Sequence, residues 1–390
     1  MYIVNLVFPG YFIWHFMMKT NHIALFFTLG TNLQTWESAG ILERELRPYQ
    51  EMIRKGYRFT FFTYGQERLY PFLGPNKIKI VNLGHTYGMG LSRITDILFS
   101  FIIPFFLKAK MKDIDLIKSN QLWGAWIPAF LKLLYRKPFI ARAGYDLYEF
   151  HLGKKSHPLK KILVKLICRF IYQMADQIVV TTKKTKNFVA TSYGIHPEKI
   201  IIQPNYINTS LFSSASTDPS NKRLIYIGRL DEHKQLEMLL HACKKAEADI
   251  DFVGSGELKD KLVALAKELG LTTRFLGNIP NQKLPDILQK YNFFALVSKS
   301  EGHPKALLEA MSCGLCPIGT NVPGIREIIS DGVNGHLTES NMDDLARTIR
   351  HAITNYETSL MLGQEARNFV VNNCSLEAFI ALETALYQRP

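Results

Sequence analysis

Short apolar runs alternate along the chain with longer segments that carry apolar residues at helical spacing. The runs are four to seven residues long and rich in Ile, Val and Phe. Such runs are typical of strands in a parallel sheet that helices cover on both faces. In the first half we predict a helix over 38–55 and strands at 23–29, 58–63, 77–82, 115–119, 138–142, 177–182 and 199–203.

A polar segment rich in turn-forming residues, 208–221, interrupts this alternation and predicts a domain boundary. A second set of strands then follows, at 224–228, 249–254, 273–277, 293–297 and 316–319. Ser375 is suited to cap a closing helix over 376–388 that packs back on the first domain. The predicted fold class is α/β, with two doubly wound Rossmann-like domains facing across a cleft, where ligands bind at the carboxyl ends of strands.

The predicted organisation has four parts. Residues 1–21 form an extension that need not belong to the fold, and residues 22–207 form an N-terminal, acceptor-side domain. Residues 208–372 form a C-terminal, nucleotide-sugar-binding domain, and 373–390 the closing helix. The first 18 residues carry no charged side chain, which suits a short membrane anchor or signal. The alternative is that translation starts at Met17 or Met18, just before the first strand.

Charge is distributed unevenly between the two halves. Residues 1–210 hold 28 Lys and Arg against 12 Asp and Glu, whereas residues 211–390 hold 19 against 22. With no zinc-ligand set and no aromatic nucleic-acid signature, the basic half favours an anionic membrane surface over nucleic acid, the alternative being a solvated basic surface without a partner. The stretch 91–111 combines apolar residues with lysines, which suits either a membrane interface or a core helix with a basic end.

Five scattered cysteines provide no disulfide framework. We therefore expect a cytoplasmic protein, with peripheral contact to the inner face of the cell membrane as a further expectation from the charge.

Two carboxylates lie at the start of a predicted helix in the stretch 300–311, which reads Ser-Glu-Gly-His-Pro-Lys-Ala-Leu-Leu-Glu-Ala-Met. Glu301 comes at the carboxyl end of an apolar strand, Pro304 suits the first helical turn, and Glu309 falls within the helix. The free N–H groups of 302–305 can receive an anion. The carboxylates suit sugar and ribose hydroxyls. Alternatively, Glu301 only stabilises the helix start and Glu309 is an ordinary helical residue.

A second motif, Gly228-Arg-Leu-Asp-Glu-His-Lys234, also follows a strand and opens a helix. Two cations five residues apart, Arg229 and Lys234, can neutralise a diphosphate, whose negative charge grows as it departs. Alternatively, both are surface residues of a loop.

Together these motifs resemble family four of the retaining glycosyltransferases, which have the glycosyltransferase-B fold. The resemblance runs from residue 23 to the C-terminus and is densest after residue 199. It is carried by Tyr226-Ile-Gly-Arg-Leu, Phe252-Val-Gly-Ser-Gly-Glu, the pair Glu301-x7-Glu309, Pro323-Gly324, Glu327 and Asp331-Gly-Val-Asn-Gly. The resemblance implies transfer of a hexosyl unit from a nucleotide-diphosphate sugar to a glycan or lipid-linked acceptor, in cell-surface polysaccharide or glycolipid synthesis.

The resemblance also implies roles for single residues. Glu301 faces the hydroxyls of the donor sugar, and Glu309 binds those of the ribose. Arg229 and Lys234 hold the diphosphate. No metal or other cofactor is implied, and no nucleic-acid partner. The remaining donor-binding positions are Gly30, Gly228, Asn278, Ile279, Gly302, His303, Pro304, Lys305 and Leu308.

The chain departs from the family pattern where many members have a His after the fifth strand. Here the sequence reads Arg142-Ala-Gly-Tyr-Asp146, so Tyr145 or Asp146 is a candidate for the contact with the sugar or the acceptor, unless this is simply a strand-end turn. A sugar-nucleotide epimerase, a phosphorylase and a non-catalytic nucleotide-sugar-binding protein remain alternative functions. The motifs specify neither the base, the sugar nor the acceptor.

Overall fold

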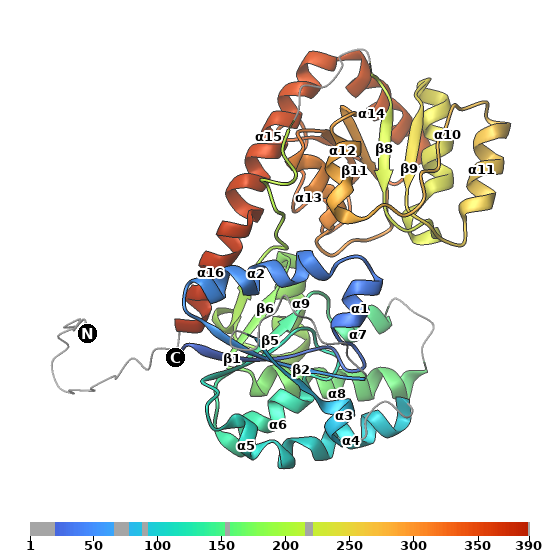
Figure 1. The fold of residues 1–390 in the computed structure, drawn as a ribbon. Helices are drawn as coiled ribbons and strands as arrows, with labels where there is room; N and C mark the ends of the chain where they lie inside the picture. Colours follow the sequence, from blue (N-terminus) through green and yellow to red (C-terminus); the bar gives the residue numbers. More distant parts are fainter. Residues whose placement is uncertain (1–19, 66–77, 88–92, 153–156, 215–220, 389–390) are drawn as a thin grey trace.

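Two parallel sheets, each flanked by helices, form the two lobes of the computed structural model (Figure 1). It describes residues 20–65, 78–87, 93–152, 157–214 and 221–388. The first sheet has the strand order β3-β2-β1-β4-β5-β6-β7 and the second the order β12-β11-β10-β8-β9. This arrangement confirms the predicted pair of doubly wound α/β domains. The strands of the first sheet are β1 (His22–Phe26), β2 (Arg58–Thr63), β3 (Ile78–Asn82), β4 (Leu116–Ser119), β5 (Phe139–Ala143), β6 (Gln177–Val180) and β7 (Ile200–Ile202).

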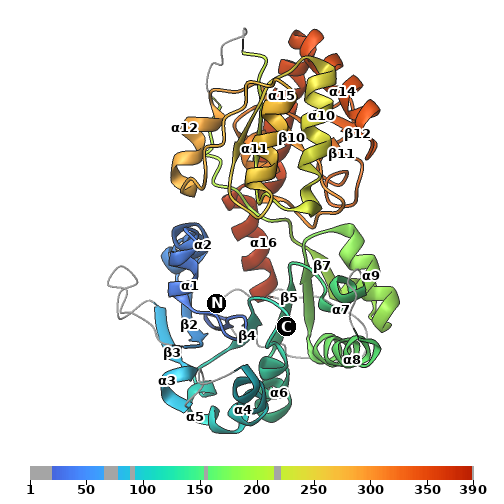
Figure 2. The same ribbon diagram turned by 90° about the vertical axis from the view of Figure 1, so that its right-hand side faces the viewer.

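Helices cover both faces of the first sheet. From β3 to β6 the chain moves across the sheet in one direction, and right-handed crossovers place the connecting helices on one face. From β1 to β2 the chain moves across the sheet in the opposite direction, so the same handedness places α2 on the other face. The helices on the face covered by the β3-to-β6 connections are α4 (Arg93–Phe106), α5 (Lys108–Met111), α6 (Trp126–Tyr135) and α8 (Pro158–Met174). The opposite face carries α2 (Leu42–Arg54) and, from the end of the chain, α16 (Leu376–Gln388), as Figure 2 shows from a second side.

The first domain also contains α1 (Leu33–Ser38), α3 (Leu83–Tyr87), α7 (Leu147–Leu152) and α9 (Lys183–Tyr193). The single helix predicted over 38–55 is therefore wrong at its start. The chain instead forms α1, then a turn at Gly40, whose φ of 66° is left-handed, and then α2. A continuous helix cannot pass through that backbone conformation.

The second domain is built from β8 (Leu224–Ile227), β9 (Ile250–Val253), β10 (Phe293–Leu296), β11 (Cys316–Thr320) and β12 (His336–Thr338). The strand predicted at 273–277 is reduced to one bridge between Phe275 and Phe252, and β12 was not predicted. The α-helices of this domain are α10 (Leu236–Ala246), α11 (Lys259–Glu268), α12 (Leu284–Leu288), α13 (Lys305–Ser312), α14 (Met342–Thr354) and α15 (Tyr356–Cys374). The five cysteines are buried free thiols.

The chain passes between the lobes twice, and the two crossings lie side by side. Ile207 donates its N–H to the carbonyl of Cys374 at 2.7 Å and forms a bridge with Ser375. The hydroxyl of Ser375 accepts the N–H of Ala378 at 3.3 Å, and α16 then buries Phe379 and Tyr387 in the core of the first domain. Among the described residues, no helix is both long enough and apolar enough to cross a membrane.

Candidate functional site

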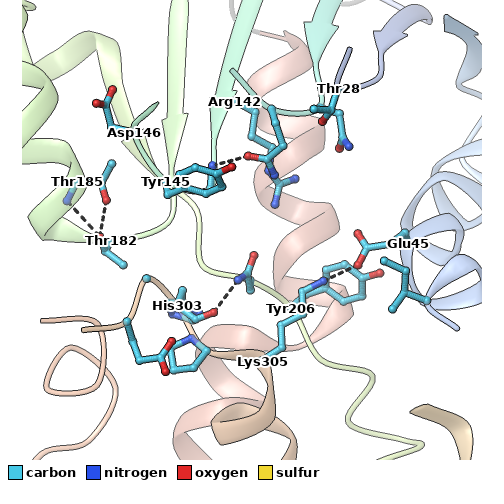
Figure 3. A pocket seen from close by; sticks show the side chains of 18 of the residues that line it. Thr28, Glu45, Arg142, Tyr145, Asp146, Thr182, Thr185, Tyr206, His303 and Lys305 are labelled. Atoms are coloured by element: carbon cyan, nitrogen blue, oxygen red, sulfur yellow. Dashed lines mark hydrogen bonds and ion pairs between the residues drawn. The ribbon is translucent and has the colours of Figure 1, made fainter. Parts of the chain in front are cut away.

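A cleft of about 1000 Å³ lies between the two lobes (Figure 3). Its first-domain wall comes from residues just after β1, β4 and β5 and from α2, and its second-domain wall from residues after β8 and β10. The carboxyl ends of parallel strands from both sheets therefore meet at one place, which is where doubly wound folds bind ligands.

Glu301 and Lys234 form the central ion pair of the second-domain wall. The ammonium of Lys234 lies 2.5 Å from Glu301 Oε1, which also accepts the hydroxyl of Ser298 at 2.7 Å. Both charged side chains are mostly buried, at 14% and 12% exposure, yet both line the cleft. The sequence placed these residues 67 positions apart, and the parallel strands β8 and β10 bring them together.

The loop that carries Arg229 is held by a neighbouring glycine. Gly254 has a φ of 134°, and a Cβ at this position would lie 1.9 Å from the carbonyl oxygen of Gly228. Only glycine permits that approach, so the loops after β8 and β9 pack directly on each other. Arg229 itself is 78% exposed, lines the cleft and lies 3.2 Å from the carboxylate of Asp231. Arg229 therefore presents a positive charge at the exposed edge of the cleft.

Glu309 faces a second, smaller cavity of about 210 Å³. Its buried carboxylate accepts a hydrogen bond from the Asn281 amide at 2.8 Å and lies 3.5 Å from the Arg44 guanidinium. Burial raises the pKa of Glu309, while Arg44 and Asn281 oppose that rise. Arg44 belongs to α2 of the first domain, so this ion pair joins the two lobes.

The start of α13 makes further contacts with the first domain. Lys305 Nζ lies 2.7 Å from Glu45 and 5.6 Å from the ring centre of Tyr206. Burial lowers the pKa of Lys305, although Glu45 opposes the shift. The carbonyl of His303 accepts the Asn205 amide at 2.7 Å, and burial lowers the pKa of its imidazole to about 4. His303 is therefore neutral near pH 7.

A third contact between the lobes lies on the other side of the cleft. The carboxylate of Glu327 accepts the N–H groups of Lys183 and Lys184 at 2.6 and 2.9 Å, at the start of α9. The helix dipole favours a carboxylate there.

Tyr145 and Asp146 have different environments. Tyr145 is 53% exposed and lines the cleft. Asp146 is fully buried, and its carboxylate accepts the hydroxyls of Tyr172 and Tyr193 at 2.9 Å. Asp146 also lines the cleft, so its contact with the sugar or the acceptor stays a prediction, although its carboxylate is held by two tyrosines of the first domain.

Some of the other donor-binding residues predicted from the sequence line the cleft, and the rest lie behind or beside it. Gly302, His303, Pro304 and Lys305 line the cleft. Gly30, with a φ of 85°, lies between Thr28 and Thr31, which line it. Leu308 is buried behind the wall, Gly228 lies against the Gly254 loop, Asn278 is exposed, and Ile279 is half-buried beside the smaller cavity's Pro280 and Asn281.

Sequence reasoning missed a buried charge cluster on the first-domain wall. The ammonium of Lys118 pairs with Glu383 of α16, and Arg142 lies 3.9 Å from the same carboxylate. Burial lowers the pKa of Lys118 to about 8, with Glu383 opposing. Lys118 lies within the apolar strand β4, and this position could have indicated a buried ion pair, because a lysine is rarely buried without a partner.

Comparisons with known proteins identify the family. Residues 49–211 match the model of glycosyltransferase family 4, and residues 209–369 match that of the glycosyl transferases group 1. The two matches together extend over most of the chain, which therefore belongs to this glycosyltransferase family, as the motifs predicted.

Two curated relatives are similar over part of their length. A phosphatidylinositol N-acetylglucosaminyltransferase component from Arabidopsis thaliana is 28% identical over 48% of this chain and 44% of its own. A Campylobacter jejuni enzyme named as an N-acetylgalactosaminyltransferase acting on a diphospho-undecaprenol-linked sugar is 29% identical over 45% of this chain and 50% of its own. The chain thus spans about half the length of these relatives.

Solved structures share the fold. Sucrose-phosphate synthase from Thermosynechococcus elongatus has a TM-score of 0.76 at 18% identity, covering 94% of this chain and 98% of its own. The Anabaena protein HepE, solved with UDP, has a TM-score of 0.72 at 16% identity, covering 94% and 99%. The molecule therefore has the glycosyltransferase-B fold.

Proposed function

We propose that the chain is a retaining glycosyltransferase that moves a hexosyl unit from a nucleotide-diphosphate sugar to a glycan or lipid-linked acceptor. The observation that carries the proposal is the ion pair between Lys234 and Glu301, at the meeting point of strand ends in a cleft between two domains. A cation and a carboxylate held side by side can bind the two chemically different parts of such a donor. The diphosphate needs positive charge, and the sugar needs acceptors for its hydroxyls.

In this proposal the donor lies along the wall made by the second domain. Glu309 accepts the ribose hydroxyls in the smaller cavity, where Arg44 must yield part of its contact with that carboxylate. Lys234 and Arg229 hold the diphosphate together with the backbone N–H groups of Gly302, His303 and Lys305. The base lies toward Asn278 and Ile279.

Glu301 then accepts hydroxyls of the sugar, next to the carbon that reacts. The bond between the anomeric carbon and the phosphate oxygen breaks, and the new glycosidic bond forms on the same face of the sugar. The departing phosphate takes the proton of the acceptor hydroxyl. Lys234 and Arg229 stabilise the charge that grows on the diphosphate, and such contacts lower the barrier because they strengthen in the transition state. The reaction needs no metal in this scheme.

The names of relatives support the choice of reactants. The Campylobacter jejuni relative is named for transfer to a diphospho-undecaprenol-linked sugar, and HepE was solved with UDP. The first name is consistent with an acceptor built on a lipid, and the second with a donor that contains a nucleoside diphosphate.

A thermal-shift screen of nucleotide sugars tests the proposal. We expect at least one sugar nucleotide to raise the unfolding temperature, and we expect release of its nucleoside diphosphate to accelerate when a matching acceptor is added. The product should keep the anomeric configuration of the donor, as NMR can show. Release of a free epimerised sugar without an acceptor, or binding without any turnover, would contradict transfer.

A further inference from the structure

The outer surface of three helices in the first domain is apolar. Helices α4, α6 and α8 lie next to one another as a layer on the sheet face opposite α2 and α16 (Figure 2). Among the described residues, 22 large hydrophobic side chains are exposed, and 12 of them lie on these three helices. They are Leu98, Phe99, Phe101, Ile102, Phe105, Phe106, Leu133, Leu134, Leu159, Ile162, Leu163 and Leu166. We call this surface the α4–α6–α8 face.

The spacing of these residues shows that the exposure belongs to whole helix faces. In α8, Leu159, Leu163 and Leu166 are 58–70% exposed and follow one another by four and three positions. Cys168 and Ile171 of the same helix are fully buried on its inner side. A helix that is apolar on both sides needs an apolar or interfacial environment outside as well as a core inside.

The same layer is strongly basic. Helices α4, α5, α6 and α8 together contain eight Lys and Arg against one acidic residue, Asp96. Lys108, Lys110, Lys160 and Arg169 are exposed among the apolar side chains. An apolar surface interspersed with cations fits the boundary between acyl chains and anionic headgroups. A second copy of the same face would bring like charges together, so self-association is disfavoured.

The face continues toward the cleft through α7, which packs against α8. Tyr145 and Phe150 are both exposed and both line the cleft, with ring centres 5.7 Å apart. Leu152, at the end of α7, is also exposed. A molecule anchored in a bilayer under the α4–α6–α8 face therefore has an apolar route along α7 into the cleft.

We propose that the α4–α6–α8 face docks on an anionic lipid bilayer and that the acceptor is lipid-linked, entering the cleft past Tyr145 and Phe150. The docking part stands on the surface alone. The acceptor part rests on the proposed transfer function. In the stretch 91–111, Ile103, Leu107 and Met111 are buried in the core, as expected for a core helix, while Leu98, Phe105 and other apolar neighbours face outward and belong to the proposed docking surface.

Vesicle co-sedimentation of the full chain tests the docking. We expect binding to vesicles of phosphatidylcholine with phosphatidylglycerol that weakens as salt rises, and much weaker binding to phosphatidylcholine alone. Changing Leu98, Phe105, Leu163 and Leu166 together to Ser should reduce the partition coefficient by at least about tenfold, since each methylene withdrawn from lipid costs about a factor of four. The matched control changes Val333 and Met361, which are 61% and 71% exposed on the second domain, to Ser and should bind like the wild type.

Measuring the binding of nucleoside diphosphates to the same variants distinguishes failure of the docking proposal from failure of the proposed transfer function. The four-residue variant should keep wild-type nucleotide affinity and lose vesicle binding. A wild-type chain that binds nucleotide but no vesicle would overturn the docking and leave the transfer function intact. A wild-type chain that binds vesicles but no nucleotide would overturn the transfer function and leave the docking intact. A dimer in sedimentation velocity that the four changes dissociate, with no lipid binding, would identify the face as a protein interface and overturn the proposal.

Discussion

Replacing Lys234 by Met tests whether this lysine acts on the donor. The substitution keeps the length of the side chain and removes its charge. Lys234 is only 14% exposed and is fixed 2.5 Å from Glu301, so it is oriented before the donor arrives. Loss of one such preorganised group costs about 2.7–4 kcal/mol of transition-state stabilisation, or about 100- to 1000-fold in kcat. Steady-state turnover of the sugar nucleotide measures the effect.

A double substitution distinguishes direct action from a supporting role. If Lys234 only neutralises Glu301, then Lys234→Met should cost nothing once Glu301→Gln has removed the carboxylate charge. We expect it still to cost at least about tenfold in that background, because the diphosphate loses its cation in either case. Lys299→Met is the matched control, since Lys299 is an exposed lysine two residues before Glu301. Wild-type turnover of Lys234→Met, or no cost in the Glu301→Gln background, would refute the role on the diphosphate.

Three further predictions concern other parts of the molecule. Burial alone would raise the pKa of Asp251, but hydrogen bonds from two arginines and a tyrosine hold it far below the ordinary value, so its stabilisation is present above about pH 4 and is lost as pH falls further. Asp251→Asn should cost about 3–5 kcal/mol at pH 7 in urea unfolding and less at pH 3, and an equal loss at both pH values would contradict this. Gly324→Ala should lower both Tm and turnover, because its φ is 88° and a Cβ would lie 2.2 Å from the carbonyl of Gly302, whereas Gly332→Ala, with a φ of 67° and open space, should lower Tm only slightly. Tyr145→Ala should raise the acceptor KM about two- to tenfold and leave the donor KM unchanged, and a raised donor KM instead would place Tyr145 on the donor.

Much of the fold could be predicted because its strands are local apolar runs. The run 58–63 coincides with β2, and the closing helix was predicted at its observed bounds. The strand predicted at 273–277 was wrong in its extent, because the segment makes only a single bridge to β9, in which Phe252 exchanges backbone hydrogen bonds with Arg274 and Leu276. The strand β12, which reads His-Leu-Thr, contains a single apolar residue and therefore gives no apolar run.

The part of the candidate site whose residues all come from the second domain could be predicted from the sequence. Glu301, Lys234 and the start of α13 are positioned by strand ends whose order follows from the chain. The contacts of Arg44 with Glu309 and of Glu45 with Lys305 were not predictable, because they join residues 265 and 260 positions apart in different domains. The burial of Asp146 was missed for a similar reason, since Tyr172 and Tyr193 reach it from α8 and α9. Sequence spacing carries no information on such pairs.

Calorimetric titration with free nucleoside diphosphates, beside steady-state rates with the intact donor, tests the central claim most directly. Glu309 is proposed to bind ribose, which does not react, and Glu301 the sugar, which does. Contacts that are equal in the ground and transition states change affinity, whereas contacts that strengthen at the transition state change kcat. We therefore predict that Glu309→Gln weakens binding of the nucleoside diphosphate, and that Glu301→Gln leaves that affinity nearly unchanged while lowering kcat with the donor. Loss of nucleotide binding in Glu301→Gln, or its retention in Glu309→Gln, would contradict the proposed orientation of the donor.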